Sequence, residues 1–151
     1  MDAVANLDDL VIRVRVATQR PAWRRNLLSG SAYELAIGDL RVLRSVERRG
    51  RRGGDVSIGD VAEDIGVEHS TASRAVTAVV AKGLLTKSVS TTDQRCTSLA
   101  LTGSGRESLR ETTRRRRGMI AEVVEDWASD DLARLIDLLE RLADDLEADR
   151  T

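Results

Sequence analysis

The chain of 151 residues contains one cysteine, Cys96, and one histidine, His69. A lone cysteine cannot form a disulfide within the chain, and two such residues are too few for a zinc site. We therefore expect neither a metal nor another cofactor. Because nothing in the sequence requires an oxidising compartment, we expect the protein in the reducing cytoplasm.

Aromatic residues and long apolar runs are also scarce. There is no phenylalanine, and the aromatic residues are Tyr33, Trp23 and Trp127, so the core must be built from Leu, Val, Ile and Ala. No apolar run approaches the roughly 20 residues that cross a bilayer. The N-terminus lacks the basic and then apolar order of a signal peptide. We expect neither secretion nor a membrane partner.

The formal net charge is only −1, but the charges are unevenly distributed. Residues 36–106 carry eleven Lys and Arg against eight acids, whereas residues 107–151 carry eight against thirteen. A basic middle followed by an acidic end indicates that only the middle meets a polyanion. No pair of nucleophile and base can be built around His69, so we expect no catalytic residues and no enzyme.

Both ends of the chain have the apolar spacing of amphipathic helices. Pro21 ends or kinks the first helix, which is apolar on two sides. We expect its second neighbour to be another copy of the chain, which predicts a homodimer; a tightly packed monomeric bundle is the alternative. The apolar residues are Leu7, Leu10, Val11 and Val14 on one side and Ile12 and Val16 on the other, with Leu132, Leu135, Ile136, Leu139, Leu142 and Leu146 in a helix between Asp130 and Asp149.

The middle of the chain predicts two helices, a tight turn and a third helix. Ala36 to Arg49 has the spacing of a helix, and a basic loop follows it. Ser57, with Asp60 three residues later, is typical of the N-cap of a short helix. Gly66 is placed to stop that helix in the left-handed conformation. The third helix, at residues 68–82, begins after too few residues for anything except a sharp turn.

A β-hairpin is predicted after Gly83, where apolar and polar residues alternate. Residues 84–90 and 96–101 form its strands, and "TTDQR" lies at the tip. The alternation places Leu85 and Val89 on one side of the first strand and Thr86, Ser88 and Ser90 on the other, and it places Leu99 and Leu101 inward on the second strand.

A long helix follows the hairpin, opened by Thr102 and Ser104 and extending to about Trp127. The predicted fold class is mainly α with a small β-hairpin wing: a winged helix-turn-helix inserted in a helical dimerisation scaffold. We divide the chain into a dimerisation helix and connector at 1–35, a winged-helix lobe at 36–103, and long and dimerising helices at 104–151.

The helix at 68–82 has a polar side without any acid. Short side chains let the backbone approach a groove closely, hydroxyls can bond phosphate oxygens or base edges, and an arginine can grip guanine or phosphate. This side predicts a recognition helix in the major groove of DNA; an indifferent solvated helix is the alternative. A wheel at 100° per residue places Ala72, Ala75, Val76, Val79 and Val80 toward the core and Ser70, Ser73, Arg74, Thr77 and Ala81 outward, flanked by Thr71 and Ala78.

The hairpin tip, residues 90–96, adds a second predicted DNA contact. Arg95 can enter the narrow and strongly negative minor groove beside the recognition helix. Asp93 is a poor DNA contact because of its charge, so we expect it to pair with Arg95 and fix the direction of that side chain. A plain surface ion pair is the alternative. His69, in the first turn of the recognition helix, either contacts DNA or packs beside the turn.

The stretch "SIGDVAEDIGVEHSTASRAVTAVVAKGLL" followed by "DQRCTSLALTGSGR" resembles the MarR family of dimeric winged-helix transcriptional regulators. The match includes the D-x-R-x-x-x-L-x-L-T pattern of the wing, and the resemblance spans nearly the whole chain. It implies a homodimer with interlocked terminal helices. It also implies recognition helices in successive major grooves of a pseudo-palindromic operator, repression of transcription, and often a pocket for a small phenolic or anionic effector.

The resemblance also suggests residues for that pocket. Trp23 and Tyr33 lie where relatives bind phenolic ligands, although packing in the core or the dimer is the alternative for each. Arg116 either lines the pocket and holds an anionic effector or extends along the interface and pairs with an acid. Cys96 is interpreted as a small packing residue of the hairpin rather than a redox sensor.

The sequence departs from the family in three places. The arginines at 48–52 lie in a loop longer than the family norm and either reach phosphate or stay solvated. Glu68 replaces an aspartate that would cap the recognition helix better, and the wing has Arg95 as its only cation.

A winged-helix module that binds another protein, with no DNA target, remains the alternative function.

Overall fold

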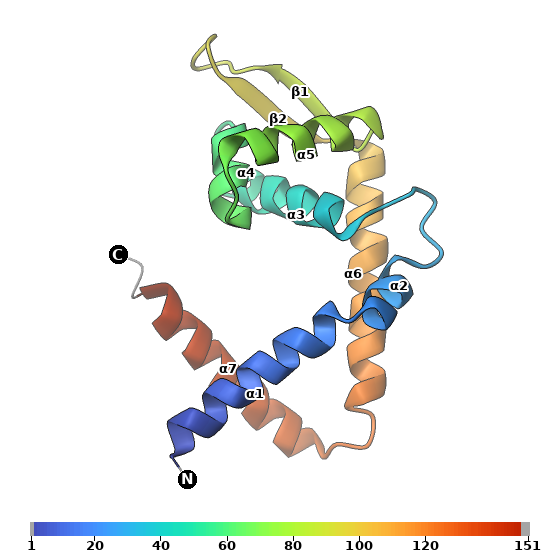
Figure 1. Cartoon of the computed structure of the whole chain (residues 1–151), viewed down its shortest axis with the longest axis vertical. Coiled ribbons are helices and arrows are strands. Elements are labelled where there is room, and N and C mark those ends of the chain that lie inside the picture. Colours follow the sequence, from blue (N-terminus) through green and yellow to red (C-terminus); the bar gives the residue numbers. More distant parts are fainter. Residues whose placement is uncertain (1, 149–151) are drawn as a thin grey trace. The chain divides into compact units, whose positions relative to one another are not determined.

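The computed structural model describes residues 2–148. It consists of helices and one antiparallel hairpin, which confirms the predicted fold class (Figure 1). The chain divides into two compact units, Met1–Arg114 and Arg115–Thr151, and the three predicted segments stay a prediction. The elements are α1 (Ala3–Gln19), α2 (Pro21–Leu28), α3 (Ile37–Arg51), α4 (Ile58–Ile65), α5 (His69–Ala81), β1 (Leu85–Val89), β2 (Thr97–Leu101), α6 (Gly103–Val123) and α7 (Ser129–Ala148).

The winged-helix lobe has the aliphatic core that the composition predicts. Helices α3, α4 and α5 contact one another, α5 also contacts β1, and α3 contacts β2. The hairpin and α5 therefore lie next to each other, as Figure 1 shows. The buried side chains at the centre include Leu40, Val42, Leu43, Val61, Ala72, Val76, Val79, Leu84, Leu85 and Leu99.

The helix-turn-helix is shaped by caps that the sequence predicts. Ser57 accepts the backbone N–H of Asp60 at 3.1 Å, and the Asp60 carboxylate accepts the backbone N–H of Ser57 at 2.8 Å. Gly66 ends α4 with φ 69° and ψ 43°, in the left-handed region that favours glycine. Glu68 makes no side-chain capping bond to α5, as expected of a poor N-cap.

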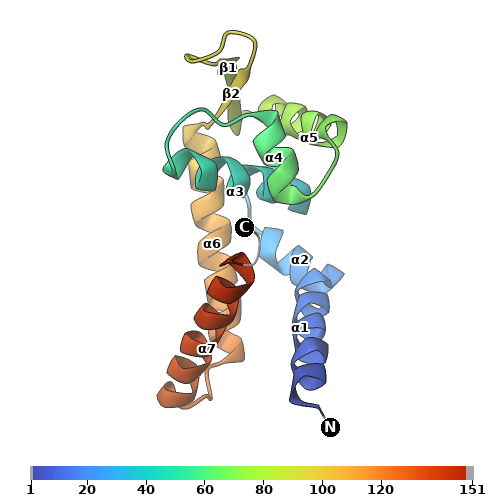
Figure 2. The ribbon, with the colours of Figure 1, turned by 90° about the vertical axis from the view of Figure 1, so that its left-hand side faces the viewer.

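The hairpin pairs Leu85 with Leu101 at its base and Val89 with Thr97 toward its tip. The two predicted sides of the first strand do not correspond to a buried and an exposed side over its whole length. Leu85 is buried but Val89 is 63% exposed, and Ser90 is buried. Figure 2 shows the hairpin extending away from the helices, so its outer part has no core to cover Val89. Ser90 turns inward because its hydroxyl bonds Asp55.

Three helix boundaries differ from the predicted ones. Pro21 begins α2 at a position where its missing N–H costs nothing, so the predicted connector contains a helix. Helix α3 continues to Arg51, beyond the predicted Arg49. Helix α6 ends at Val123, because a turn follows in which the Trp127 N–H donates to the Val124 carbonyl at 3.0 Å.

The terminal helices α1 and α7 display apolar side chains to solvent within the single chain. Every residue of α1 is exposed, and no residue of α7 up to Ala148 is buried. The predicted end of that helix at Asp149 lies outside the described residues. Within residues 2–148, none of the helices combines the length and apolarity needed to cross a bilayer.

Gly50 offers a stability test of the extended α3. A Cβ at this position would meet no atom within 4 Å. Because glycine pays more backbone entropy than alanine in a helix, Gly50→Ala should stabilise the fold by about 0.5–1 kcal/mol. Gly53→Ala is the matched control: its φ is +83°, so alanine there should cost roughly 1–2 kcal/mol. Urea unfolding at one protein concentration measures both, and a destabilised Gly50 variant would contradict the helix.

Candidate nucleic-acid interface

The outward side of α5 agrees with the predicted recognition surface. Ala72, Val76 and Val79 are buried against the lobe. Toward solvent, Ser70, Thr71, Arg74 and Thr77 are exposed and Ser73 is half-buried. His69 is exposed as well, and its role stays a prediction.

Most polar side chains on this surface have no hydrogen-bond or ion-pair partner in the described part of the chain. Among residues 2–148, no side chain forms a hydrogen bond or ion pair with those of Ser70, Thr71 or Arg74. Thr77 donates its hydroxyl to the Ser73 carbonyl at 2.9 Å, which leaves its oxygen free to accept. Because α5 contains no acid, it presents hydroxyl groups and a guanidinium without a competing carboxylate.

An ion pair that sequence reasoning missed holds the C-terminal end of α5. Lys82 follows the last turn of α5 and pairs with Asp39 at 2.5 Å. Asp39 is buried at the start of α3, where its carboxylate also accepts the Ala36 N–H at 2.7 Å. Its pairing with Lys82 had no local signal, because the two are far apart along the chain.

Most of the arginines at 48–52 form ion pairs with acids of the lobe. Arg49 bonds Asp64 at 2.7 Å and also reaches Glu63, and Arg48 pairs with Asp64 at 2.9 Å. Arg49 holds the pKa of the Asp64 carboxyl well below its usual range, and Asp64 in turn raises the pKa of Arg49. The expectation that these arginines are free and solvated is therefore corrected for Arg48 and Arg49, which join α3 to α4. A phosphate contact of residues 48–52 stays a prediction.

Asp93 contacts the backbone of Arg95 in the wing and not its side chain, which differs from the prediction. Arg95 is exposed, and its guanidinium has no partner among residues 2–148. The predicted pairing of its side chain with Asp93 is wrong for this described part of the chain. Asp93 instead accepts the backbone N–H of Arg95 at 3.0 Å, which shapes the turn and leaves the guanidinium free.

Cys96 is exposed rather than a packing residue, which corrects the prediction. Its thiol donates to the Asp93 carboxylate at 3.4 Å, and that carboxylate raises the pKa of the thiol. A raised pKa lowers the fraction of reactive thiolate. This agrees with the expectation that Cys96 is not a redox sensor.

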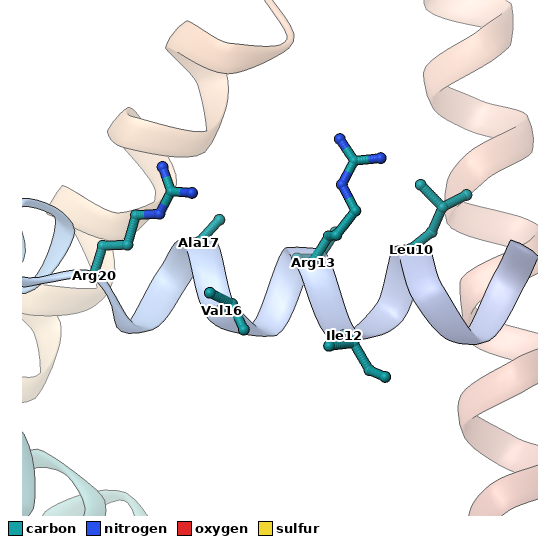
Figure 3. Close-up of a pocket in the computed structure, with 7 residues that line it drawn as sticks. Leu10, Ile12, Arg13, Val16, Ala17 and Arg20 are labelled. Carbon is teal, nitrogen blue, oxygen red and sulfur yellow. The ribbon is translucent and has the colours of Figure 1, made fainter.

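The predicted effector residues are not brought into one described pocket. Trp23 and Tyr33 are half-buried in the first unit, and Arg116 is half-buried in the second. A hollow lies along α1. Figure 3 shows side chains that line it, with Leu10 and Arg13 on one side of the helix and Ile12 on the other. This hollow has a volume of about 400 Å³, and its lining includes none of the three. The effector residues stay a prediction.

No three His, Cys, Asp or Glu side chains of the described part of the chain gather where they could hold a metal ion. What the lobe does display is a helix with free hydroxyls and a free arginine, next to a hairpin with a second free arginine. This arrangement defines a winged helix-turn-helix.

Comparison with known proteins shows which family this chain is similar to. The sequence model of the MarR family matches residues 35–95. A MarR family protein from Bacillus stearothermophilus is 18% identical with a TM-score of 0.80, covering 97% of this chain and 99% of that one. FabT of Streptococcus pneumoniae, solved in complex with DNA, is 19% identical with a TM-score of 0.72 and coverage of 96% and 98%. No curated protein sequence matches significantly.

A third structure, the PcaV transcriptional regulator from Streptomyces coelicolor, is 25% identical with a TM-score of 0.59, covering 93% of this chain and 97% of that one. The resemblance to the MarR family is thus confirmed: residues 35–95 carry the family's sequence pattern, and nearly the whole chain has the fold of its solved members. The fold is that of MarR family transcriptional regulators.

Proposed function

We propose that this protein is a homodimeric, sequence-specific DNA-binding regulator of transcription, acting as a repressor in the cytoplasm. Helix α5 enters the major groove, and the wing at residues 90–96 reaches the minor groove. The observation that carries the proposal is the acid-free side of α5, where Ser70, Thr71 and Arg74 are exposed and unpartnered. The DNA complex of the similar FabT supports double-stranded DNA as the partner.

The division of roles follows from the chemistry of these side chains. Ser70 and Arg74 bond phosphates and supply affinity that falls with salt. Thr71, Ser73 and Arg74 read base edges, while Arg95 reads the width of the minor groove. His69 and Thr77 extend the contact at either end of the same surface. Asp93 acts indirectly, through the backbone of the wing tip.

The homodimer is supported by the apolar side chains that the single chain leaves exposed. On α1, Leu10, Val11 and Ile12 are each about half exposed, and Ile136 and Leu139 on α7 are similar. Apolar surface of this extent is a common mark of a subunit interface. Two-fold symmetry would place the two α5 helices on half-sites about one helical turn apart.

A small phenolic or anionic effector that relieves repression is the remaining part of the proposal, with Trp23, Tyr33 and Arg116 as its contacts. A compound that binds the folded dimer but not the unfolded chain raises its melting temperature, because it stabilises the folded state by RT ln(1 + L/Kd), where L is the concentration of free compound. A thermal-shift screen of phenolic and anionic compounds is therefore the first test. Loss of a shift in Arg116→Ala would assign the anion contact.

Arg95→Ala tests the DNA contact of the wing. Operator sequences are first selected by the purified protein from random duplexes. Removing the guanidinium should weaken binding of the selected duplex about tenfold, the scale of one arginine contact to DNA. Sedimentation should show an unchanged dimer, because Arg95 lies on the wing. Fluorescence anisotropy measures the affinity.

Arg110→Ala is the charge-matched control, because it removes one exposed arginine from α6, outside α5 and the wing. It should change affinity less than Arg95→Ala does. Equal losses for the two variants would mean that net charge, not the wing, explains binding. If the wild type selects no duplex at all, the DNA proposal fails and the protein-interaction alternative replaces it.

A further inference from the structure

Asp55 ties the base of the wing to the loop between α3 and α4. Its carboxylate accepts hydrogen bonds from Ser90 at the end of β1, from Thr92 in the tip at 3.1 Å, and from Ser98 on β2 at 3.0 Å. One side chain thus joins both strands and the tip. The hydroxyls of Ser90 and Ser98 hold the pKa of the Asp55 carboxyl below its usual value, so the carboxylate is ionised and can accept all three.

A short chain of hydrogen bonds runs from Asp55 to Arg95. Ser90 is buried, and because its proton goes to Asp55, its oxygen accepts the backbone N–H groups of Thr92 and Asp93, each at 3.1 Å. Asp93 then accepts the N–H of Arg95 at 3.0 Å. Each link sets the direction of the next, so the backbone that carries the free guanidinium is positioned from Asp55.

The loop that carries Asp55 is itself fixed to the hairpin. The residue after it, Val56, is buried and accepts the N–H of Leu99 on β2 at 2.8 Å. The backbone beside Asp55 is therefore hydrogen-bonded to the same hairpin that its side chain holds. None of its three hydroxyl partners is close to it in sequence, so no local pattern predicts the cluster.

We propose that Asp55 is a positioning residue for DNA binding, which holds the wing so that Arg95 meets the minor groove. This inference rests on the proposed function. For the change in DNA affinity when Asp55 is removed, it predicts the opposite sign to net charge alone. By charge alone, removing an acid from a DNA-binding lobe should strengthen binding to a polyanion. If Asp55 positions the wing, removing it weakens binding.

Asp55→Asn in the full-length protein is the main test. Asparagine offers one acceptor oxygen in place of two, and its NH₂ competes with the Ser90 hydroxyl, which already accepts two N–H groups. Affinity for a labelled duplex that the wild type selects should fall by about three- to tenfold, no more than the loss of the Arg95 contact itself. Glu68→Gln is the control, because Glu68 is an exposed acid at the start of α5 without a capping bond. It should bind slightly more tightly.

A double-mutant cycle with Arg95→Ala separates positioning from general damage. If Asp55 acts through Arg95, Asp55→Asn should have no further effect in the Arg95→Ala background. Ser98→Ala removes one donor without changing the charge and should give a smaller loss of the same kind. It keeps the test valid if the Asp55 variant fails to fold, and the thermal midpoint is measured for each protein.

Three results would overturn the inference: unchanged or tighter binding by Asp55→Asn, an equal loss in the Arg95→Ala background, or full affinity of Ser98→Ala when the Asp55 variant is unfolded. With a wild type that binds its selected duplex, these results leave the proposed function intact. A wild type that selects no duplex overturns both.

Discussion

Gly105→Ala should destabilise the winged-helix lobe more than any other glycine substitution in the described chain. Gly105 lies buried in the first turn of α6, and a Cβ there would sit 2.1 Å from the Leu84 carbonyl oxygen and 3.1 Å from Leu101 Cδ2. A backbone oxygen cannot move aside as a side chain can. The same oxygen accepts the N–H of Thr102 at 3.1 Å, so displacing it also breaks the bond that places α6.

The expected cost is about 3 kcal/mol, the upper end of the range for overpacking a rigid interior. Urea unfolding at a fixed protein concentration measures it, since a dimer makes the midpoint depend on concentration. Gly103→Ala is the matched control, because it lies in the same turn and a Cβ there meets nothing within 4 Å. Equal midpoints for the two variants would show that α6 does not approach Leu84 so closely.

The elements that the sequence predicts well are those with local signals. Ser57 and Asp60 cap the short helix within four residues, and Gly66 stops it by a conformation that other residues avoid. The side of α5 that holds Arg74 follows from helical periodicity, which depends only on neighbouring positions. The fold class and the exposed surface of the recognition helix could therefore be predicted without any tertiary information.

The rest of the site depends on contacts between distant residues. Asp55 and Ser98 are separated by 43 residues, as are Asp39 and Lys82. Nothing local distinguishes these carboxylates from ordinary surface acids. The exposure of Val89 and the burial of Ser90 were likewise not predictable, because alternation predicts which residues share a side but not where the core ends. Arg48 and Arg49 were expected in a solvated loop because the sequence does not show their acidic partner Asp64 on α4.

Asp64→Asn is expected to lower the free energy of unfolding by an amount comparable to that of Gly105→Ala, because it removes a carboxylate that is largely buried in the lobe. The Asp64 side chain is only 11% exposed and accepts bonds from Ser45, Arg48 and Arg49. Removing one partner from a buried ion pair leaves the other charge without compensation, which costs about 3–5 kcal/mol. We expect about 3 kcal/mol at neutral pH, toward the lower limit, because Arg49 keeps Glu63 and Asp60 as partners.

The pH dependence of the stability lost in Asp64→Asn identifies the cause of the loss. The folded-state pKa of Asp64 is depressed, chiefly by Arg49, so its contribution to stability is complete above the unfolded-state pKa of about 4 and is lost as the pH falls below it. The gap in unfolding free energy between wild type and Asp64→Asn should therefore narrow on acidification below about pH 4. Glu63→Gln is the control, because Glu63 also pairs with Arg49 but is 76% exposed, and it should cost less than about 1 kcal/mol. A gap that stays constant with pH would assign the loss to packing rather than to the ion pairs that join α3 to α4.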